Sequence, residues 1–223
     1  MYKKDQSIKL LLQQKLLPPY YHNDPEISKS ILQALYEAGI RMAEYTARGE
    51  NALTNFKELR KFVDVQMNDM QLGIGTIKNV RQARSFINEG ADFIVSPIIN
   101  EEVGSVTHDS GLLWIPGCMS PTEIARAEES GATIIKIFPG NILGPSYIQS
   151  IKELFPGLRF MPTGGVEAEK KNLKEWFASG VVAVGMGSKL ISKELVEDKD
   201  FKAIRNATEH VLRIIKEITS THK

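Results

Sequence analysis

The chain has 223 residues, of which 42% are hydrophobic and 25% charged, as in an ordinary globular protein with a sizeable core. Its 28 basic and 27 acidic residues leave a net charge of +1, which argues against a nucleic acid or a membrane surface as a partner. The single cysteine, Cys118, excludes an internal disulfide, and no stretch approaches the roughly 20 apolar residues of a membrane span. We therefore expect a cytoplasmic protein.

The beginning of the chain predicts a helix, a strand and a second helix. Residues 7–15 have the pattern of a short amphipathic helix, and the apolar and aromatic run at 16–21 has that of a strand. Asp24 followed by Pro25 marks the next helix start, because a capping residue precedes a proline at the first helical position. We expect this helix to end at Gly39.

From Gly39 onward the chain repeats one pattern, in which a glycine ends a helix and an apolar strand follows at once. Glycine at a helix C-terminus accepts the left-handed conformation that turns the chain back. The strands expected directly after such glycines are 40–47, 91–97, 132–138 and 181–185. Further strands are expected at 71–76, 112–118 and 158–163, and helices at 51–66, 79–89, 100–110, 121–130, 145–155 and 168–178.

Together with the first strand, this pattern gives eight strands that alternate with helices. It predicts a single-domain (β/α)₈ TIM barrel over residues 1–223, with a short N-terminal helix and an amphipathic C-terminal helix at 201–218. An open doubly wound parallel sheet is the alternative. We favour the barrel because no glycine-rich dinucleotide turn follows the first strand, and because polar residues stand at the ends of many strands.

One lysine lies in an unusually apolar strand. In the stretch 133–140, Ile134, Lys136 and Phe138 share one face of the expected strand. A charged ammonium would lose solvation there, so the neutral amine is favoured, and a neutral amine is a nucleophile towards ketones. The sequence therefore predicts Schiff-base chemistry, and the alternative is a lysine that reaches solvent at the strand end or pairs with a buried carboxylate.

A carboxylate also points to the expected interior. Met42, Glu44 and Thr46 share one face of the strand at 40–47, where a core should be apolar. Beside a nucleophilic lysine, Glu44 would serve the several proton transfers that imine formation and hydrolysis require. The alternative is a buried ion pair that only neutralises Lys136.

Two strand ends near the C-terminus of the chain are rich in glycine. Gly164 and Gly165 follow one, and Gly187 and Ser188 follow the next. Barrels often bind phosphate at their last two strand ends, where a short helix N-terminus contributes, and we expect such a helix to begin near Ser188. Arg48, after the strand at 40–47, either clamps a substrate carboxylate or is a solvated surface arginine.

No set of residues predicts a metal site. His22 ends the first expected strand, and the other three histidines lie in helical or tail segments, without the spacing of metal ligands. Cys118 is expected to be a small core residue beside a turn.

Five motifs, in chain order, resemble the keto-deoxy-phosphogluconate / keto-hydroxyglutarate aldolases, which are class I (Schiff-base) barrel enzymes. They are Glu44-Tyr45-Thr46, Gly73-Ile74-Gly75-Thr76, Ile135-Lys136-Ile137-Phe138-Pro139, Pro162-Thr163-Gly164-Gly165-Val166 and Gly185-Met186-Gly187-Ser188. The resemblance covers about residues 8–215. It implies a lyase of the Entner–Doudoroff pathway that acts on small keto acids and aldehyde phosphates, needs no metal or other cofactor, and assembles as a homotrimer.

The resemblance also implies roles for individual residues. Lys136 would form the Schiff base, and Glu44 would be the acid/base that works through water. The residues implied to hold the pyruvate-derived end are Arg48, Thr76, Pro97 and Thr163, and those implied to receive the phosphate are Gly164, Gly165, Gly187 and Ser188. The chain departs from the family pattern at His22, where many relatives have arginine at or near this position, and at Ile98, where relatives often have glycine.

The reaction implied is the reversible cleavage of 2-keto-3-deoxy-6-phosphogluconate to pyruvate and glyceraldehyde 3-phosphate. The galactonate-derived epimer and 4-hydroxy-2-oxoglutarate are the alternative main substrates. A phosphate-binding barrel isomerase or epimerase is an alternative of another class, but it would require inward histidines or aspartates. A non-catalytic ligand-binding barrel would not need both Lys136 and Glu44.

Overall fold

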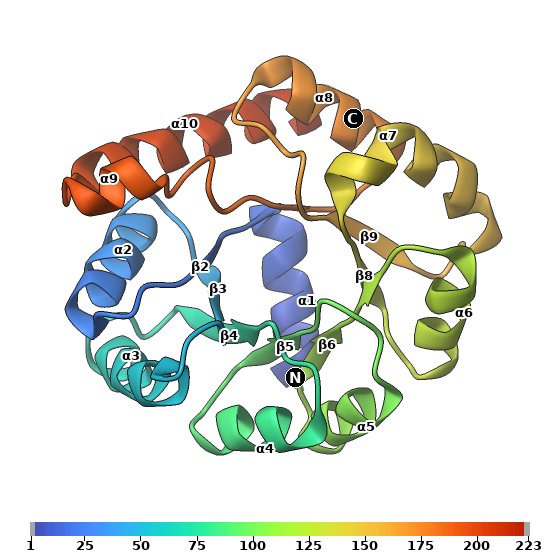
Figure 1. Cartoon of the computed structure of the whole chain (residues 1–223). Helices are drawn as coiled ribbons and strands as arrows, with labels where there is room; N and C mark the ends of the chain where they lie inside the picture. The colour runs from blue at the N-terminus through green and yellow to red at the C-terminus, as the bar shows by residue number, and fades with distance from the viewer. Residues whose placement is uncertain (1–2, 221–223) are drawn as a thin grey trace.

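The strands of this protein close into a ring, and the helices surround it (Figure 1). The computed structural model describes residues 3–220, so the ends of the expected domain, residues 1–2 and 221–223, lie outside the described residues. The strands are β1 (Leu16–Leu17), β2 (Pro19–Tyr20), β3 (Met42–Thr46), β4 (Gln71–Gly75), β5 (Phe93–Val95), β6 (Leu113–Ile115), β7 (Gly117–Cys118), β8 (Ile134–Ile137), β9 (Arg159–Pro162) and β10 (Val184–Gly185).

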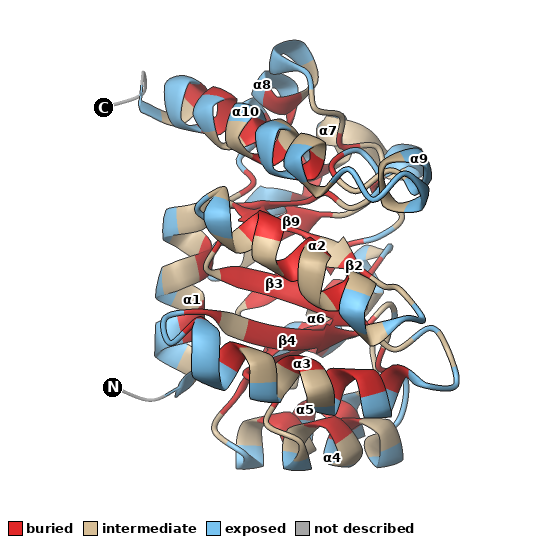
Figure 2. Cartoon of the chain, turned by 90° about the vertical axis from the view of Figure 1, so that its left-hand side faces the viewer, coloured by how far each residue is buried: buried red, intermediate tan, exposed pale blue. Residues whose placement is uncertain are grey.

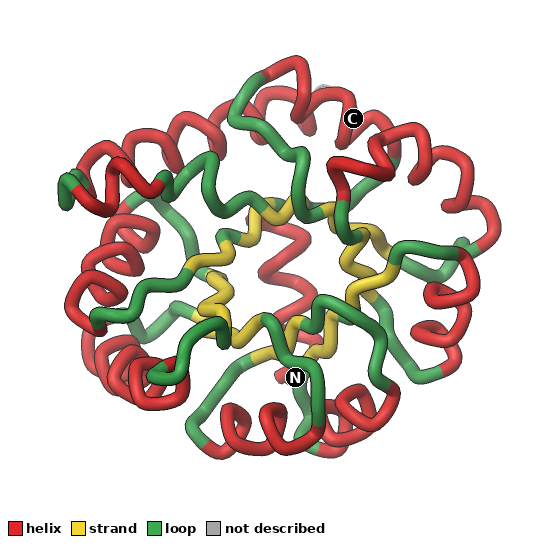
Figure 3. Tube along the Cα trace, in the orientation of Figure 1, coloured by secondary structure: helices red, strands yellow, loops and turns green. Residues whose placement is uncertain are grey.

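All strand pairings in the described chain are parallel, as expected for this fold (Figure 3). Pro18 separates β1 from β2 and Pro116 separates β6 from β7, because proline has no N–H to give to the ladder. β1 pairs with β10 and β2 with β3, and a bridge between Thr163 and Gly185 joins β9 to β10. The eight predicted strands thus close as a (β/α)₈ barrel, which confirms the predicted fold class.

The helices follow the predicted order. They are α1 (Lys3–Gln14), α2 (Pro25–Glu37), α3 (Ala52–Gln66), α4 (Val80–Asn88), α5 (Glu101–Asp109), α6 (Pro121–Glu129), α7 (Gly140–Ile151), α8 (Lys170–Ser179), α9 (Lys193–Glu197) and α10 (Phe201–Ser220), with a 3₁₀ turn at Lys152–Leu154. The Asp24 side chain accepts the N–H of Glu26 and caps α2, as predicted. None of the helices in the described part of the chain has the length and apolarity needed to cross a bilayer.

Two apolar cores stabilise the barrel, one inside the ring and one between the strands and the helices (Figure 2). The inner core includes Leu17, Met42, Phe93 and Ile134, and Leu11 of α1 joins it. The α1 helix therefore packs against the barrel interior. Gln14 ties α1 to the start of β3, since its side chain accepts the N–H of Met42 and donates to the carbonyl of the same residue. The opposite end, where the strands end, stays accessible for a site.

The helix expected at 145–155 corresponds to the second part of α7 and the 3₁₀ turn after it, because the non-helical Gly144 divides α7 just before Pro145. The structure adds a first turn from Gly140, whose N–H donates to the Thr163 carbonyl. One helix prediction near the strand ends is wrong. No helix begins near Ser188. The N–H groups of Leu190 and Ile191 both turn back to the Gly187 carbonyl, and α9 begins only at Lys193.

Candidate active site

Lys136 lies on β8 and faces the interior of the barrel. It is 6% exposed, and its strand neighbour on the same face, Ile134, belongs to the inner core. Ile135 and Ile137 pack in the outer core, so the predicted alternation is confirmed. The amine Nζ lies 5.3 Å from the centre of the Phe138 ring, which is 38% exposed. The lysine thus lies in a largely apolar setting next to the barrel opening.

Glu44 lies on β3 and faces the same interior. Its side chain is almost fully buried, and Oε1 lies 3.9 Å from Nζ of Lys136. Burial raises the pKa of the Glu44 carboxyl, and the charges of Lys136 and Arg48 only partly offset that rise. A carboxyl with a raised pKa exchanges protons closer to neutral pH than an exposed one, which suits an acid/base group.

A cavity of about 430 Å³ opens at the ends of the first, second and last strands of the barrel. Neither Lys136 nor Glu44 is among the residues that line it. Its wall contains Pro19, which is the register partner of Glu44, and Thr46, which lies on the same face of β3 as Glu44. Its lining residues are Pro19, Tyr20, Tyr21, His22, Thr46, Arg48, Gly187, Ser188, Ile191, Lys193, Val196 and Glu197.

Three of the residues expected to bind substrate meet in this cavity: Arg48, Gly187 and Ser188. The two glycines after β9 do not line it. Gly164 and Gly165 pack instead against Asn141 at the start of α7, so close that a Cβ on Gly165 would lie 2.7 Å from the Asn141 Cα. The two glycine-rich turns nevertheless follow neighbouring strands, which the bridge between Thr163 and Gly185 joins.

The remaining expected residues surround the interior at other strand ends. Thr76 follows β4 in a left-handed conformation with φ of +66°, which is uncommon for a residue other than glycine and is found at functional sites. Thr163 follows β9 and is bridged to Gly185, and Pro97 follows β5 with its carbonyl against Gly117. These positions ring the barrel opening, as predicted for strand ends.

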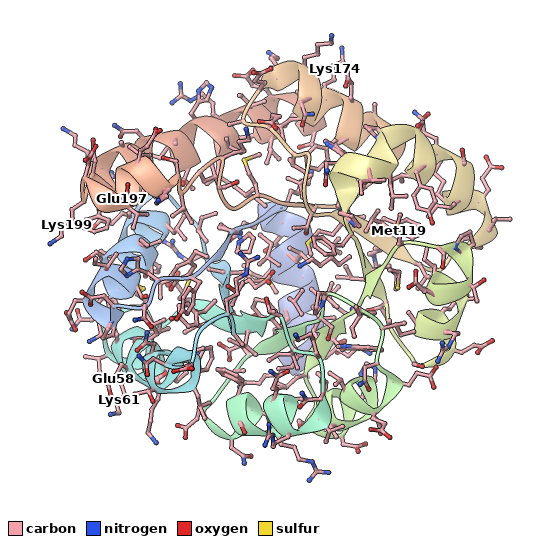
Figure 4. The ribbon with its side chains drawn as sticks, viewed as in Figure 1. Glu58, Lys61, Met119, Lys174, Glu197 and Lys199 are labelled. Carbon is pink, nitrogen blue, oxygen red and sulfur yellow. The ribbon has the colours of Figure 1, made fainter. Side chains whose placement is uncertain are left out.

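The sequence analysis missed two charged residues of the cavity, Lys193 and Glu197. They lie one turn apart on α9, with Lys193 Nζ 3.4 Å from Glu197 Oε1, and Figure 4 shows Glu197 at the rim of the barrel. The only available signal was Ser192, a good N-cap residue, and its side chain does accept the N–H of Leu195. Without a predicted α9, nothing pointed to these side chains.

His22 also lines the cavity, and its ring is oriented by the backbone. Its Nδ1 accepts the N–H of Asp24 at 3.0 Å, which leaves Nε2 as the donor. Among the described residues, no group of three or more histidine, cysteine, aspartate or glutamate side chains is arranged to hold a metal ion. His222 lies outside the described residues.

Cys118 is buried at the end of β7, and its thiol is expected to be unreactive. Burial raises the pKa of Cys118 to about 12, and the nearby Glu123 charge adds to the rise. Iodoacetamide should therefore leave the native protein unmodified at pH 7.5 and alkylate it once urea unfolds the chain. Intact-mass spectrometry checks this, and rapid labelling of the native protein would contradict it.

Comparison with known proteins agrees with this geometry. The family model for KDPG and KHG aldolase matches residues 8–207. The 2-dehydro-3-deoxy-phosphogluconate aldolase of Treponema pallidum is 33% identical over 186 residues, which are 83% of this chain and 86% of the relative. A probable 2-dehydro-3-deoxy-6-phosphogalactonate aldolase of Rhizobium meliloti is 30% identical over 167 residues, 74% of this chain and 76% of the relative.

A solved structure shares the barrel. KDPG aldolase from Legionella pneumophila, with pyruvate captured as a covalent carbinolamine intermediate, has a TM-score of 0.82 and 25% identity. The match covers 91% of this chain and 96% of that one. These findings confirm the family that the five motifs predicted. The chain belongs to the KDPG and KHG aldolase family, and it is an aldolase, a lyase that cleaves a carbon–carbon bond.

Proposed function

We propose that this aldolase reversibly cleaves 2-keto-3-deoxy-6-phosphogluconate to pyruvate and glyceraldehyde 3-phosphate through a Schiff base on Lys136. The observation that carries the proposal is the buried pair of Lys136 and Glu44, which lie 3.9 Å apart in the interior of the barrel. The name of the Treponema pallidum relative, 2-dehydro-3-deoxy-phosphogluconate aldolase, supports the choice of substrate.

The chemistry proceeds in balanced steps. The amine of Lys136 attacks the C2 ketone, and the carbinolamine loses water to give a protonated imine. Glu44 shuttles the protons for this dehydration through a water molecule. The imine then accepts the electron pair of the C3–C4 bond as the C4 hydroxyl loses its proton, which releases the aldehyde and leaves an enamine of pyruvate. Protonation at C3 and hydrolysis free pyruvate and the lysine.

Other residues hold the two ends of the substrate in this proposal. Arg48, Thr76, Pro97 and Thr163 hold the pyruvate-derived end, and Arg48 lies near enough to lower the pKa of Glu44. Gly187 and Ser188 receive the phosphate in the cavity, where Lys193 adds positive charge. Gly164 and Gly165 remain proposed phosphate residues on the resemblance alone.

The preference for a phosphorylated substrate tests the proposed cavity. Lys193→Ala should lower kcat/KM for the phosphorylated substrate by about 2–5-fold, the worth of one exposed charge contact, because the Lys193 side chain is 86% exposed. Ser188→Asp should remove the preference, because its carboxylate would repel the phosphate. Steady-state kinetics on 2-keto-3-deoxy-6-phosphogluconate and its unphosphorylated analogue measures both effects.

A matched control for Lys193 lies close by. Lys199 follows α9, and Figure 4 shows it projecting outward from the rim, so Lys199→Ala should leave both kcat/KM values unchanged. Equal kcat/KM of the wild type for both substrates would contradict phosphate binding in the cavity. The unphosphorylated 4-hydroxy-2-oxoglutarate would then become the favoured substrate.

One relative favours a second substrate. The Rhizobium meliloti protein is named for the phosphogalactonate compound, whose reaction differs only in the configuration of one hydroxyl. The same lysine and carboxylate would serve that cleavage. Ranking kcat/KM for the gluconate-derived, galactonate-derived and hydroxyglutarate substrates on one preparation identifies the main activity.

Metal removal should have no effect on this chemistry. In a Schiff-base aldolase the protonated imine withdraws electrons in place of a metal ion. We expect full activity after exhaustive dialysis against EDTA, measured with a coupled assay whose second enzyme needs no metal. A loss that zinc or magnesium restores would place the enzyme in another mechanistic class of aldolase.

We also propose that the enzyme acts in the cytoplasm, in the Entner–Doudoroff pathway, as a homotrimer. The exposed apolar side chains around the barrel opening support self-association, since scattered polar loops would be expected there in a monomer. They are Ile98, Met119, Phe138 and Ile142, and Figure 4 shows Met119 at the rim near α6.

A further inference from the structure

We propose that Gly75 is a positioning residue, whose missing side chain creates the slot that holds the Glu44 carboxylate opposite Lys136. This inference rests on the proposed role of Glu44 as the acid/base. Gly75 ends β4, the strand next to β3 in the barrel, and it pairs in register with Thr46. Its backbone carbonyl accepts the N–H of Ala47, so the two strands stay joined at this level.

The slot is narrow. A Cβ atom built on Gly75 would lie 2.5 Å from Cδ and 2.7 Å from Cγ of Glu44, and nearer still to Oε1. Real Cβ atoms essentially never approach heavy atoms within 3.0 Å, so any other residue at position 75 would displace the carboxylate. The sequence explains why this space exists, because the last two inward positions of β4, Gly73 and Gly75, are both glycines.

The two glycines serve different neighbours. Gly73 makes room for the ring of Phe93, whose nearest carbon would collide with a Cβ at that position, and Phe93 belongs to the apolar inner core. Gly75 makes room for the carboxylate one step further along the strand. Gly73 therefore supports packing, whereas Gly75 faces the proposed chemistry.

The Glu44 carboxylate is positioned by packing, because no hydrogen bond from a described protein group holds it in place. Within residues 3–220 the Glu44 carboxylate makes no hydrogen bond to a protein donor, and its ion pair with Lys136 spans 3.9 Å. At that separation a water beside the pair, rather than between the two atoms, can hydrogen-bond to both, which is compatible with proton transfer through water. The carboxylate is thus located by the slot on one side and by the Lys136 charge on the other.

A size exchange between positions 75 and 44 tests the inference. Gly75→Ala alone should lower kcat by about 100-fold, as expected for a displacement of about 1 Å. Glu44→Asp alone should lower kcat by about 10–100-fold, because the shorter side chain moves the carboxylate away from Lys136. In the double variant, the aspartate places no atom at the position of Glu44 Oε1, which is the atom that the alanine Cβ would approach most closely. The double variant should therefore have a kcat less than about 10-fold below that of Glu44→Asp alone.

Two measurements separate positioning from a general loss of structure. The first is the exchange of the C3 protons of pyruvate with deuterium, which needs the imine, the enamine and the proton shuttle but no aldehyde. The second is thermal unfolding by circular dichroism, so that rates are compared per folded molecule. Gly73→Ala is the matched control, because it should lower the unfolding temperature while the folded molecules keep the pH dependence of turnover.

The outcomes are distinct. The role of Gly75 would be overturned if the fold losses of kcat in the two single variants multiplied in the double variant. It would also be overturned if Gly75→Ala showed normal proton exchange and normal turnover. If Gly75→Ala does not fold, the inference is decided by Gly75→Ser and Glu44→Asp/Gly75→Ser, which must show the same rescue for it to stand. If Glu44→Gln turns over normally and pyruvate labels no lysine, the proposed function itself fails. If Glu44→Gln lowers turnover but Gly75→Ala leaves turnover unchanged, the proposed function stands and only the positioning role of Gly75 is rejected.

Discussion

Replacing Lys136 by methionine should abolish turnover and covalent capture of pyruvate together. In the wild type, pyruvate with borohydride should leave one reduced adduct, on the peptide that contains Lys136, because the amine is buried among largely apolar side chains in the barrel interior. Peptide mass mapping locates the adduct, and steady-state kinetics measures the loss.

The variant should remain folded, which makes the experiment informative. Methionine matches the length and apolar character of the lysine stem, and Glu44 can become neutral, since the Lys136 charge is the larger of the two charges that lower the pKa of that buried carboxyl. Lys174→Met on the outer surface of α8, seen in Figure 4, is the control and should keep both activity and labelling. An adduct on a different lysine, with activity retained in Lys136→Met, would refute the mechanism.

Glu44→Gln should lower kcat by about 10²–10⁴-fold, the usual worth of a positioned acid/base, while pyruvate still binds. Amide and carboxyl have nearly the same shape, so the slot against Gly75 stays filled. Saturation with pyruvate in slow borohydride trapping measures binding, and single-turnover cleavage measures the chemical step. If Glu44→Gln is less stable but turns over normally per folded molecule, Glu44 has no catalytic role and only neutralises Lys136.

The raised pKa of Glu44 also predicts the direction in which the stability of the protein changes with pH. Burial raises the folded-state pKa of Glu44 above its unfolded value, so the folded state holds this proton more tightly. The contribution of Glu44 to stability is therefore greatest at low pH and falls as pH rises from the unfolded pKa through the raised one. The free energy of unfolding, measured in urea between pH 4 and pH 8, should lose this component in Glu44→Gln, and the pH–rate profile should lose one limb.

The order of the strands and helices could be predicted from local sequence patterns alone. Gly39, Gly90, Gly131 and Gly180 were expected to end helices, and all four have positive φ angles in the structure. The alternation within β8 was likewise readable, because a strand turns every second side chain to the same face. Both signals depend only on residues a few positions apart.

Local sequence was not sufficient for the edges of the site. The turn after Gly187 was mistaken for a helix start, since the glycine-serine pattern does not show that two N–H groups bond back to one carbonyl. Lys193 was missed for the same reason, because its place in the cavity depends on a short helix with a weak signal. The close approach of Gly165 to Asn141 at the start of α7 was likewise not readable, because the two residues are 24 positions apart in the chain.

The sequence by itself determined that the barrel forms, that Lys136 and Glu44 point into it, and to which family the chain belongs, because periodicity and motif order are properties of the chain. The tertiary structure alone decided how far apart Lys136 and Glu44 lie, which residues share the cavity, and that Gly75 leaves space for a carboxylate from another strand. Those features arise from close approach between segments distant in the chain. Such contacts are fixed by how the strands close and pack, and no local pattern encodes them.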